Sequence, residues 1–550
     1  MLAVTALALL LFITKSTAQL LFPVNQVAFE LRPNATHLGG AGALWGEKRV
    51  PRIAIVGCGA GGSSSAYFLS HFGKLRDLGL ETDVTIYDAA DYIGGRSTVI
   101  WPWNDDPLKD PRPLGANRND TAYESPVEMG ASIFVAANRN LQKAVRVFGL
   151  DLDAYGGEEG QTAIWDGERW VYEESGRFGW DWWSKVKAVW RYGRSPFTVR
   201  SLVKETVANF LSLYSPAFVS QGAFASLANF SAATHLQSAA SLYADEYLGQ
   251  AGVGELFTNE LISAATQVNY GTPITRLHGV GALVSLAATG ATSVRGGNRQ
   301  IFENFVGRSG ARLRLGDNAR VQSILKLDGA RDKRAQWVVR TASGIGGGTY
   351  DAVILASPFH QANLQVINSV APALIPKQPY VRLYVTFVIT NATTPQASYF
   401  DLPPETRMPN EIFGTFTTPS RSKPTFNSLN YLKALPQVIG ARFGDGVFHV
   451  VKMFSDRSLE PELLNGLYGA GNVAKVVEKV WLAYPHLKPI TSEADFAPVR
   501  PDEGLYYVNG FERLISTMET ETVSSFNAVS LLLNDFFNYT PPTSWAEWED

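Results

Sequence analysis

The stretch "IAIVGCGAGGSSSAYFL", which begins at Ile53, constrains the fold of this chain more than any other. Its apolar start is typical of a buried strand, and glycines in the pattern G-x-G-x-x-G follow it. Glycine allows a tight turn, lets the backbone approach a pyrophosphate and lets a helix pack on the strand. We expect that helix at about 61–72, with its positive N-terminus facing the phosphates. The predicted cofactor contacts in this turn are Gly57, Gly59, Ala60, Gly61 and Gly62.

A second strand and a second glycine turn extend this pattern. "DVTIYDAA" predicts a strand that ends at Asp88, whose carboxylate can accept hydrogen bonds from ribose hydroxyls. "YIGGRSTVI" then places Gly94, Gly95 and Arg96 after that strand. Another backbone-accessible turn with a guanidinium suits a dinucleotide longer than NAD, which favours FAD. The alternative is a glycine-rich turn without a ligand, but the order of strand, glycines, helix and acid favours a cofactor.

Length and composition limit the remaining choices. A chain of 550 residues exceeds the usual size of one hydrophobic core, so we expect at least two substructures. The 48 basic and 51 acidic residues are spread without long runs of one sign, which argues against a nucleic-acid surface. Cys58 is the single cysteine, so the chain can form no internal disulfide and no cysteine-based metal site. The seven histidines lack the spacing of metal ligands.

The first residues, "MLAVTALALLLFITKSTAQ", predict a signal peptide. An apolar run precedes the small residues "STA", so we expect residues 1–18 to be removed and the mature chain to begin near Gln19. A membrane anchor is the alternative. Five Asn-X-Ser/Thr sequons fit a glycoprotein of the secretory pathway, either secreted or in the lumen of a lysosome or vacuole. They lie at Asn34, Asn119, Asn229, Asn391 and Asn538.

Near the C-terminal end, "STMETETVSSFNAVSLLL" predicts a helix. Ser516 and Glu519 have the S-x-x-E spacing of a capping box, so we expect the helix to begin at about Thr517. The N–H groups of such a helix can hold partial negative charge on the pyrimidine end of a reduced flavin. The alternative is an ordinary core helix.

Several motifs resemble known proteins. "GGR" resembles the flavin amine oxidase superfamily, and the longer motifs resemble one family within it, the prenylcysteine oxidases, also called prenylcysteine lyases. The resemblance extends from about Ile53 to Leu533. Its most distinctive parts are "QVNYG" followed by "SVRGGN", and "YYVNGFE" followed by "STME"; further parts are "RYGRSP", "PYVRLYVTF" and "VKMFS".

The resemblance implies an α/β fold: a Rossmann-type FAD-binding domain with an interleaved α+β substrate-binding domain, as in the flavin amine oxidases. It implies an FAD-binding domain made of residues 50–149, 289–361 and 489–540, and a substrate domain made of residues 150–288 and 362–488. The resemblance implies that Arg96 lies by the diphosphate of bound FAD and that Gly94 and Gly95 lie near the flavin ring. Further implied cofactor contacts are Gly130, Ala131, Ser132, Val321, Glu512 and Met518. Arg382 stands where many flavin amine oxidases carry a lysine near flavin N5, so it is the catalytic candidate, with a structural salt bridge as the alternative.

The implied reaction is the FAD-dependent oxidation of a farnesyl- or geranylgeranyl-cysteine thioether to cysteine, a prenyl aldehyde and hydrogen peroxide. The expected partners are therefore prenylcysteine and oxygen, with no nucleic acid and no obligate protein partner. A tryptophan cluster suggests core packing, the wall of a substrate tunnel or peripheral membrane contact. Its members are Trp165, Trp170, Trp180, Trp182, Trp183 and Trp190. Two alternatives stay open: an FAD-dependent amine or polyamine oxidase, and a lumenal protein that binds flavin or prenyl lipid without turnover.

Overall fold

A parallel five-stranded sheet forms the centre of the computed structural model, which describes residues 50–71, 78–111, 124–154, 162–173, 190–288, 290–327, 334–415 and 424–541. Its strand order is β20-β13-β1-β2-β9, and every neighbouring pair is parallel. The strands are β1 (Arg52–Val56), β2 (Asp83–Tyr87), β9 (Arg312–Arg314), β13 (Ala352–Leu355) and β20 (Leu505–Tyr507). The expected strands after Ile53 and before Asp88 are thus both present, and the parallel order confirms the Rossmann-type topology.

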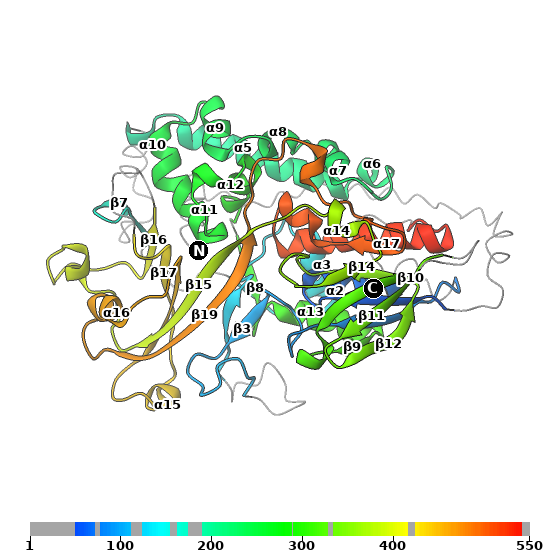
Figure 1. Cartoon of the computed structure of the whole chain (residues 1–550). Helices are drawn as coiled ribbons and strands as arrows, with labels where there is room; N and C mark the ends of the chain where they lie inside the picture. The colour runs from blue at the N-terminus through cyan, green and yellow to red at the C-terminus, as the bar shows by residue number, and fades with distance from the viewer. Residues whose placement is uncertain are drawn as a thin grey trace.

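Helices from distant parts of the chain cover one face of this sheet (Figure 1). The helix that follows the glycine turn is α2 (Ala60–His71), one residue earlier than expected at each end. It packs against α17 (Met518–Phe537), α13 (Arg299–Ser309) and α3 (Arg139–Phe148), as the contacts of Phe68 with Phe305 and Phe526 show. The helices α2, from the beginning of the described chain, and α17, from its end, therefore share one hydrophobic core.

A smaller sheet covers the other face. Its order is β12-β11-β10-β14, with β10 (Val321–Leu327), β11 (Gln336–Thr341), β12 (Gly344–Tyr350) and β14 (Gln365–Ile367). Trp337 and Val339 pack with Ala54 and Val56 of the central sheet. Because β14 pairs with β10, the structure extends the second segment of the nucleotide-binding domain beyond the expected boundary at residue 361, to Ile367.

A seven-stranded mixed sheet and a group of helices form the second substructure (Figure 1). The sheet order is β19-β15-β18-β17-β16-β6-β7, with β6 (Thr162–Trp165), β7 (Trp170–Glu173), β15 (Tyr380–Thr390), β16 (Glu411–Gly414), β17 (Ser428–Ala434), β18 (His449–Ser455) and β19 (Val473–Pro485). The helices are α5 (Ser195–Leu211), α6 (Pro216–Val219), α7 (Leu227–Ala233), α8 (Gln237–Ala240), α9 (Ala244–Gln250), α10 (Glu255–Phe257), α11 (Ser263–Tyr270) and α12 (Gly279–Ser285). One turn at Thr258–Ile262 is a π-helix.

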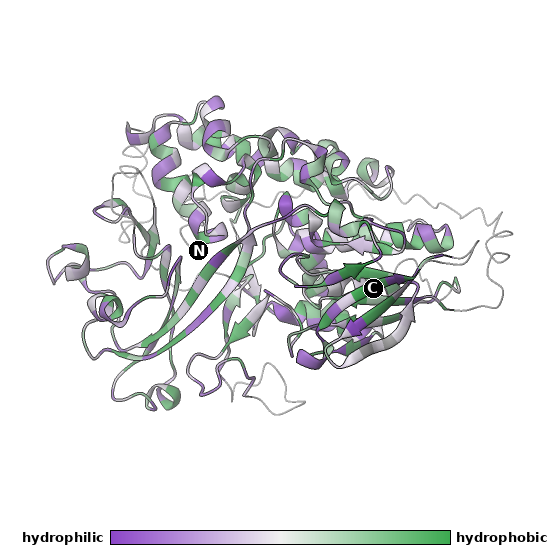
Figure 2. Ribbon diagram, in the orientation of Figure 1, coloured by the Kyte–Doolittle hydropathy of each residue, from purple (hydrophilic) through white to green (hydrophobic). Residues whose placement is uncertain are grey.

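Short elements complete the two substructures. They are the pair β3 (Thr98–Ile100) and β4 (Val127–Gly130), the pair β5 (Leu152–Ala154) and β8 (Thr292–Val294), and the helices α14 (Ala371–Leu374), α15 (Gln437–Gly440) and α16 (Pro461–Tyr468). The strands of the central sheet are largely hydrophobic in Figure 2, as a sheet covered on both faces requires. Among the described helices, none is both long and apolar enough to cross a bilayer.

The tryptophan cluster divides between core and surface. Trp165 and Trp170 pack on Phe400, with ring centroids 5.2 and 4.9 Å away, so they belong to the core of the mixed sheet. Trp190 is 90% exposed. Trp180, Trp182 and Trp183 lie outside the described residues, as does the predicted signal peptide.

The cap of α17 differs from the expected one. Thr517 is the N-cap, and its side chain pairs reciprocally with Thr520 rather than with Glu519. Glu519 instead points away from its own helix and accepts the backbone N–H groups of Asn140 and Leu141 at 2.9 and 3.1 Å, together with the hydroxyl of Tyr214. Because the carboxylate of Glu519 binds the start of α3 and Tyr214, it takes no part in the cap of its own helix. Glu519 thereby ties α17 to the first turn of α3.

We predict that Glu519 makes stability depend on pH. Burial raises the pKa of Glu519 to about 7, against 4.5 for an ordinary glutamate. Between these values the folded chain keeps a proton that the unfolded chain releases, so the free energy of unfolding falls as pH rises. In Glu519→Gln the slope of the free energy of unfolding against pH should become less steep, by the amount that corresponds to up to one proton released on unfolding. The free energy of unfolding at pH 5 should fall by about 1–3 kcal/mol, because the amide N–H₂ of Gln faces buried hydrogen-bond donors. Urea unfolding at a series of pH values measures both effects. The exposed Glu462→Gln is the control, and a slope unchanged in Glu519→Gln would contradict the assignment.

Candidate functional site

A cavity of about 1520 Å³ runs between the two substructures. Its wall combines the glycine turns, the N-terminal end of α17, the end of β19 and the helices α5, α11 and α12. A pocket for one small ligand measures about 300–1,000 Å³, so this cavity has room for a large cofactor and a second molecule.

In the glycine turn after β1, two glycines are required by close packing and a third faces open space. Gly57 has a φ of +109°, and a Cβ there would lie 2.3 Å from the carbonyl oxygen of Ala356. A Cβ at Gly62 would lie 1.8 Å from the carbonyl oxygen of Gly57, so helix and strand pack there without a side chain. Gly59 differs, since its added Cβ would meet nothing closer than 3.8 Å. Its missing side chain therefore serves the open cradle and not the packing.

Asp88 connects this turn to the second strand. Its carboxylate accepts the backbone N–H of Cys58 at 2.6 Å and that of Ala90 at 2.8 Å, and it lines the cavity. Burial raises the pKa of Asp88, with these two hydrogen bonds acting in the opposite direction. A carboxylate has about four lone-pair sites, so it retains capacity for ribose hydroxyls.

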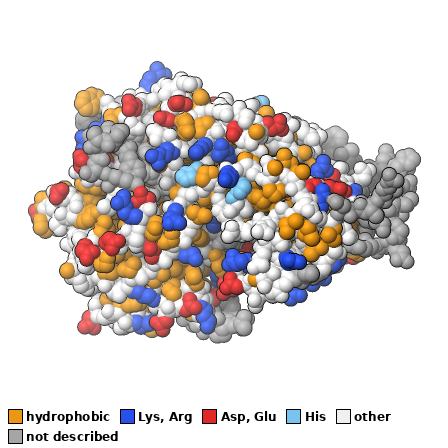
Figure 3. Space-filling model, in the orientation of Figure 1, with side chains coloured by type: hydrophobic (Ala, Val, Ile, Leu, Met, Phe, Trp, Pro, Cys, Tyr) orange, Lys and Arg blue, Asp and Glu red, His pale blue; other side chains and the backbone are white. Residues whose placement is uncertain are grey.

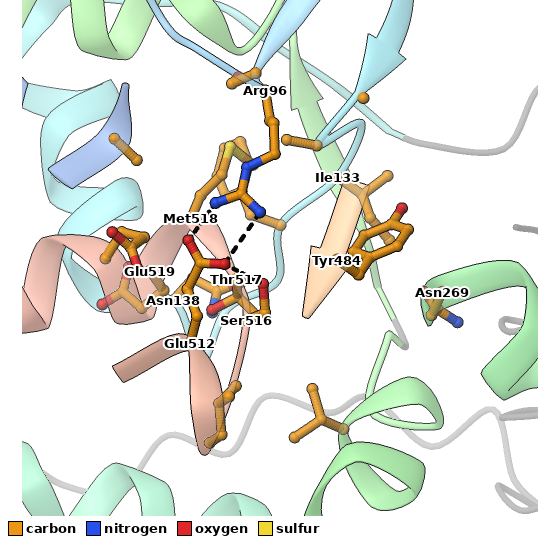
Figure 4. Close-up of a pocket in the computed structure, with 18 of the residues that line it drawn as sticks. Arg96, Ile133, Asn138, Asn269, Tyr484, Glu512, Ser516, Thr517, Met518 and Glu519 are labelled. Carbon is orange, nitrogen blue, oxygen red and sulfur yellow. Dashed lines mark hydrogen bonds and ion pairs between the residues drawn. The ribbon is translucent and has the colours of Figure 1, made fainter. Parts of the chain in front are cut away.

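Arg96 lines the cavity, but its charge is already paired (Figure 4). Its guanidinium binds both carboxylate oxygens of Glu512 and donates to the carbonyl of Ala483 at 2.9 Å. Tyr380 donates its hydroxyl to the same carboxylate at 2.8 Å. The place of Arg96 by the diphosphate stays a prediction. In the structure its guanidinium joins β19 and the segment before α17. Glu512 is thus brought to the cavity by a residue 416 positions away.

Glu521 and Asn509 are polar residues of the wall that sequence reasoning missed. Both are buried, and Asn509 donates to Glu521 at 3.2 Å. Within the described part of the chain, Glu521 Oε1 and Asn509 Oδ1 have no hydrogen-bond partner, although both residues line the cavity. Burial and the neighbouring Glu512 raise the pKa of Glu521 well above its ordinary value, which favours the neutral carboxyl.

These groups fit the expected cofactor, FAD. The open cradle at Gly59 and the N-terminus of α2 suit its pyrophosphate, and Asp88 suits a ribose. The unsatisfied oxygens of Glu521 and Asn509 suit the hydroxyls of the ribityl chain, because buried polar atoms require partners.

The Gly130–Ala131–Ser132 segment forms a further part of the wall. Ala131 has a φ of +52°, which is uncommon for a residue other than glycine. Asn298 holds it by donating Nδ2 to the Ala131 carbonyl at 2.8 Å. Asn298 belongs to the "GGN" motif, so this motif supports the wall from behind and does not itself line the cavity.

The N-terminal end of α17 faces the cavity through Ser516, Thr517 and Met518 (Figure 4). This is the arrangement expected for a helix that stabilises negative charge on a bound ring. On the other side of the cavity Figure 4 shows Ile133, Asn269 and Tyr484.

The rest of the cavity is mainly apolar. Its lining includes Val203, Val207, Phe210, Val268, Tyr270, Val284, Ala287 and Ala288. On α5 the lining residues run from Arg200 to Phe210, which corresponds to about 15 Å of helix at 1.5 Å per residue. Tyr270 and Tyr484 meet edge to face, with centroids 5.7 Å apart and planes at 81°.

Three predicted site residues do not line the cavity. Gly62 packs against Gly57, and Val321, the first residue of β10, is buried in the core that β10 shares with the central sheet. Arg382 is exposed on β15, opposite Leu482. A catalytic group must contact the reacting atoms, so the exposed position of Arg382 does not support the role expected for it. The other predicted residues line the cavity: Gly57, Gly59, Ala60, Gly61, Asp88, Gly94, Gly95, Arg96, Gly130, Ala131, Ser132, Glu512 and Met518.

We predict that Gly59→Ala folds but loses FAD. The φ of Gly59 is not in the left-handed region, and the methyl group comes no closer than 3.8 Å to a protein atom, so the chain tolerates it. The methyl group occupies the space that a pyrophosphate needs, and FAD affinity should fall about tenfold or more, or about 1.4 kcal/mol. Gly59→Val should abolish loading. Absorbance at the flavin bands and thermal unfolding measure the two properties.

The control is Gly307→Ala, at an exposed position on α13 with no atom within 4 Å of the added methyl group. It should keep both FAD and stability. Gly62→Ala should lose stability, since its methyl group collides with the backbone of Gly57. Normal FAD content in Gly59→Val would refute the cradle.

Alignments with known proteins of similar sequence extend over most of the chain. Prenylcysteine oxidase 1 from Bos taurus is 27% identical over 507 residues, which are 88% of this chain and 89% of that protein. Farnesylcysteine lyase from Arabidopsis thaliana is 26% identical over 501 residues, or 88% of each.

Solved structures show the same fold at low identity. Cyclohexylamine oxidase from Brevibacterium oxydans aligns with a TM-score of 0.54 and 12% identity, over 88% of this chain and 99% of that one. Putrescine oxidase with bound putrescine aligns with a TM-score of 0.53 and 14% identity, over 88% and 99%. The expected α/β architecture with an interleaved second domain is thereby confirmed. Residues 175–541 match the sequence profile described as prenylcysteine lyase, and the chain belongs to that family.

Proposed function

We propose that this protein is an FAD-dependent thioether oxidase that cleaves farnesyl- or geranylgeranyl-cysteine to cysteine, the prenyl aldehyde and hydrogen peroxide. Family membership and the names of the relatives support the substrate class. The observation that carries the proposal is the continuous cavity, whose polar half fits FAD and whose other half is mainly apolar. Such an enzyme acts in the breakdown of prenylated proteins.

The apolar half suits an isoprenoid chain. A farnesyl group has fifteen carbons, and burying each contributes about 0.8 kcal/mol before the costs of binding. The stretch of α5 from Arg200 to Phe210 is long enough to accompany such a chain, and Val203, Val207 and Phe210 offer it apolar contacts. The length of the isoprenoid chain therefore contributes more to the binding affinity than any single polar contact does.

The reaction requires little acid–base chemistry from the protein. When bound, FAD would supply the two-electron acceptor for the hydride that leaves the carbon between the sulfur and the double bond. The cation left on the substrate is stabilised by both neighbours; water adds to it, a proton is released, and the hemithioacetal collapses to aldehyde and thiol. Two electrons and two protons then reduce oxygen to peroxide. The chain binds and orients the thioether, and the N-terminus of α17 stabilises the charge that arrives.

The amine oxidase alternative has one observation in its favour, the Tyr270–Tyr484 pair beside the polar half of the cavity. Aromatic rings attract ammonium groups. The two rings meet edge to face, however, so they do not present two parallel faces to one cation.

We predict that farnesylcysteine and oxygen yield cysteine, farnesal and peroxide in equal amounts. Under anaerobic conditions farnesylcysteine should bleach the flavin absorbance, because the hydride has no other acceptor. Putrescine and benzylamine should leave the flavin oxidised. Absorption spectra with each compound decide between the two activities, and bleaching by amines alone would favour the amine oxidase.

The matched control is S-hexahydrofarnesyl-cysteine, which has the same length but no double bond. Its cation lacks allylic delocalisation, so it should bind with similar affinity and react far more slowly. An equal rate would mean that hydride loss from the allylic carbon is not the difficult step. FAD that never bleaches with any thioether would favour a binding protein without turnover.

We also propose that the protein enters the secretory pathway and works in a lysosome or vacuole, or is secreted. Three of the five sequon asparagines are described, and Asn229, Asn391 and Asn538 are all exposed. Exposure is what attachment of a glycan requires, so the surface supports this proposal. Asn34 and Asn119 lie outside the described residues.

We predict that the chain expressed in eukaryotic cells begins near Gln19 and loses mass on glycosidase treatment. N-terminal sequencing and intact mass spectrometry measure the two features. The triple variant Asn229→Gln, Asn391→Gln, Asn538→Gln should lose most of the shift. An intact Met1 without glycans would place the chain outside this pathway.

Peripheral membrane contact stays a prediction. Hydrophobic side chains are scattered among charged ones on the face in Figure 3, without a basic patch of one sign. The features that support contact are the exposed Trp190 and Phe197, together with Val476, Val480 and Leu482 on the outer face of β19. Leu482 also lines the cavity, so this exposed row, which Glu478 interrupts, reaches the cavity.

A further inference from the structure

Lys452 is a buried cation directly behind the cavity wall. It lies on β18, with 6% of its surface exposed, and its ammonium donates to the Glu128 carbonyl at 2.7 Å and to Ser132 Oγ at 3.3 Å. It also sits over the ring of Phe454, 4.9 Å from the centroid. Among the described residues no carboxylate forms an ion pair with Lys452, so its charge is held without a counter-ion in contact.

The direction of the hydrogen bond at Ser132 follows from the chemistry of lysine. A protonated ammonium only donates, so Ser132 Oγ must accept from it. The hydroxyl proton of Ser132 is then left without an acceptor in the described protein, although Ser132 lines the cavity. Its free direction is toward the cavity, where a bound ligand can supply an acceptor.

We propose that Lys452 is a positioning residue, which turns the Ser132 hydroxyl into the cavity so that this hydroxyl donates a hydrogen bond to the ring system of bound FAD. Ser132 is the group that contacts the cofactor, and Lys452 acts only through it. The inference depends on FAD binding and not on the identity of the substrate. It can therefore fail while the proposed reaction holds, and it can hold while the proposed reaction fails.

Three sequence motifs meet at this point. "VKMFS" contributes Lys452, "VEMGAS" contributes Glu128 and Ser132, and "GGN" contributes Asn298, which donates its backbone N–H to Glu128 Oε1 at 2.7 Å. Asn298 and Lys452 therefore hold the same wall segment from two sides. The charged residues Glu128 and Lys452 do not line the cavity, so these two side chains support the wall that Ser132 presents to the ligand.

The arrangement has a pH limit. Burial lowers the pKa of Lys452 to about 8, and Glu128 opposes that shift. Burial raises the pKa of Glu128 also to about 8, against the effects of Asn298, Lys452 and Arg299. The register neighbours of Lys452 on β15 and β17 are the uncharged Phe387 and Asn430, so Glu128 is the titratable group that faces it. Above this pH a neutral amine can accept the Ser132 proton, and the hydroxyl turns away from the cavity.

The test follows the absorption maximum of bound FAD and its dissociation constant in the full-length protein, from about pH 6 to about pH 10. In the wild type the maximum should shift with an apparent pKa near 8. Ser132→Ala should remove that shift and weaken FAD about 2- to 10-fold, the value of one hydroxyl hydrogen bond. Lys452→Met should remove the shift too, and its effect on FAD should largely vanish in the Ser132→Ala background.

Lys433→Met is the matched control, because Lys433 is a partly buried lysine on the adjacent β17 that binds Glu124 and the Ser125 carbonyl. It should leave the titration unchanged. Should Lys452→Met fail to fold, Ser132→Ala alone still decides, since it removes one atom. A titration that persists in Ser132→Ala, or equal effects of Lys452→Met with and without Ser132, would overturn the proposal.

Discussion

The close packing of α17 on α2 is the contact on which the site depends. The helices meet where Gly61 leaves room, and Ser525 donates its hydroxyl to the Gly61 carbonyl at 2.6 Å. A Cβ at Gly61 would lie 2.9 Å from Glu521 Oε2, so any larger residue would separate the helices. This contact brings a segment more than 450 residues along the chain to the glycine turn. With it come the groups that complete the polar half of the cavity.

Local patterns predicted the parts of the site that depend on neighbouring residues. The strand, the glycine turn, the helix and Asp88 follow one another within about forty positions, and their backbone geometry requires those residue types. The start of α17 was also placed within one residue. The parallel sheet and the interleaved second domain followed from motif order and resemblance.

Pairings between distant residues could not be predicted in this way. Glu519 matches a capping box in sequence, yet a stronger set of donors at the start of α3 binds its carboxylate. On β15 the pairing with β19 shifts between Val381 and Arg382. Such a bulge changes which side chains face the core, and no feature of "PYVRLYV" reveals it. Lys452 lay unnoticed in "VKMFS" because nothing in the motif shows that its strand is buried.

The strand order of the central sheet has a consequence for biosynthesis. β1 lies between β2 and β13, and β13 in turn needs β20, whose residues are among the last to be translated. The nucleotide-binding half therefore cannot close until the chain has left the ribosome as far as Tyr507, and its early strands wait with unpaired edges. Chaperones that shield those edges during synthesis, rather than a stable N-terminal domain, would then govern how much of the protein matures.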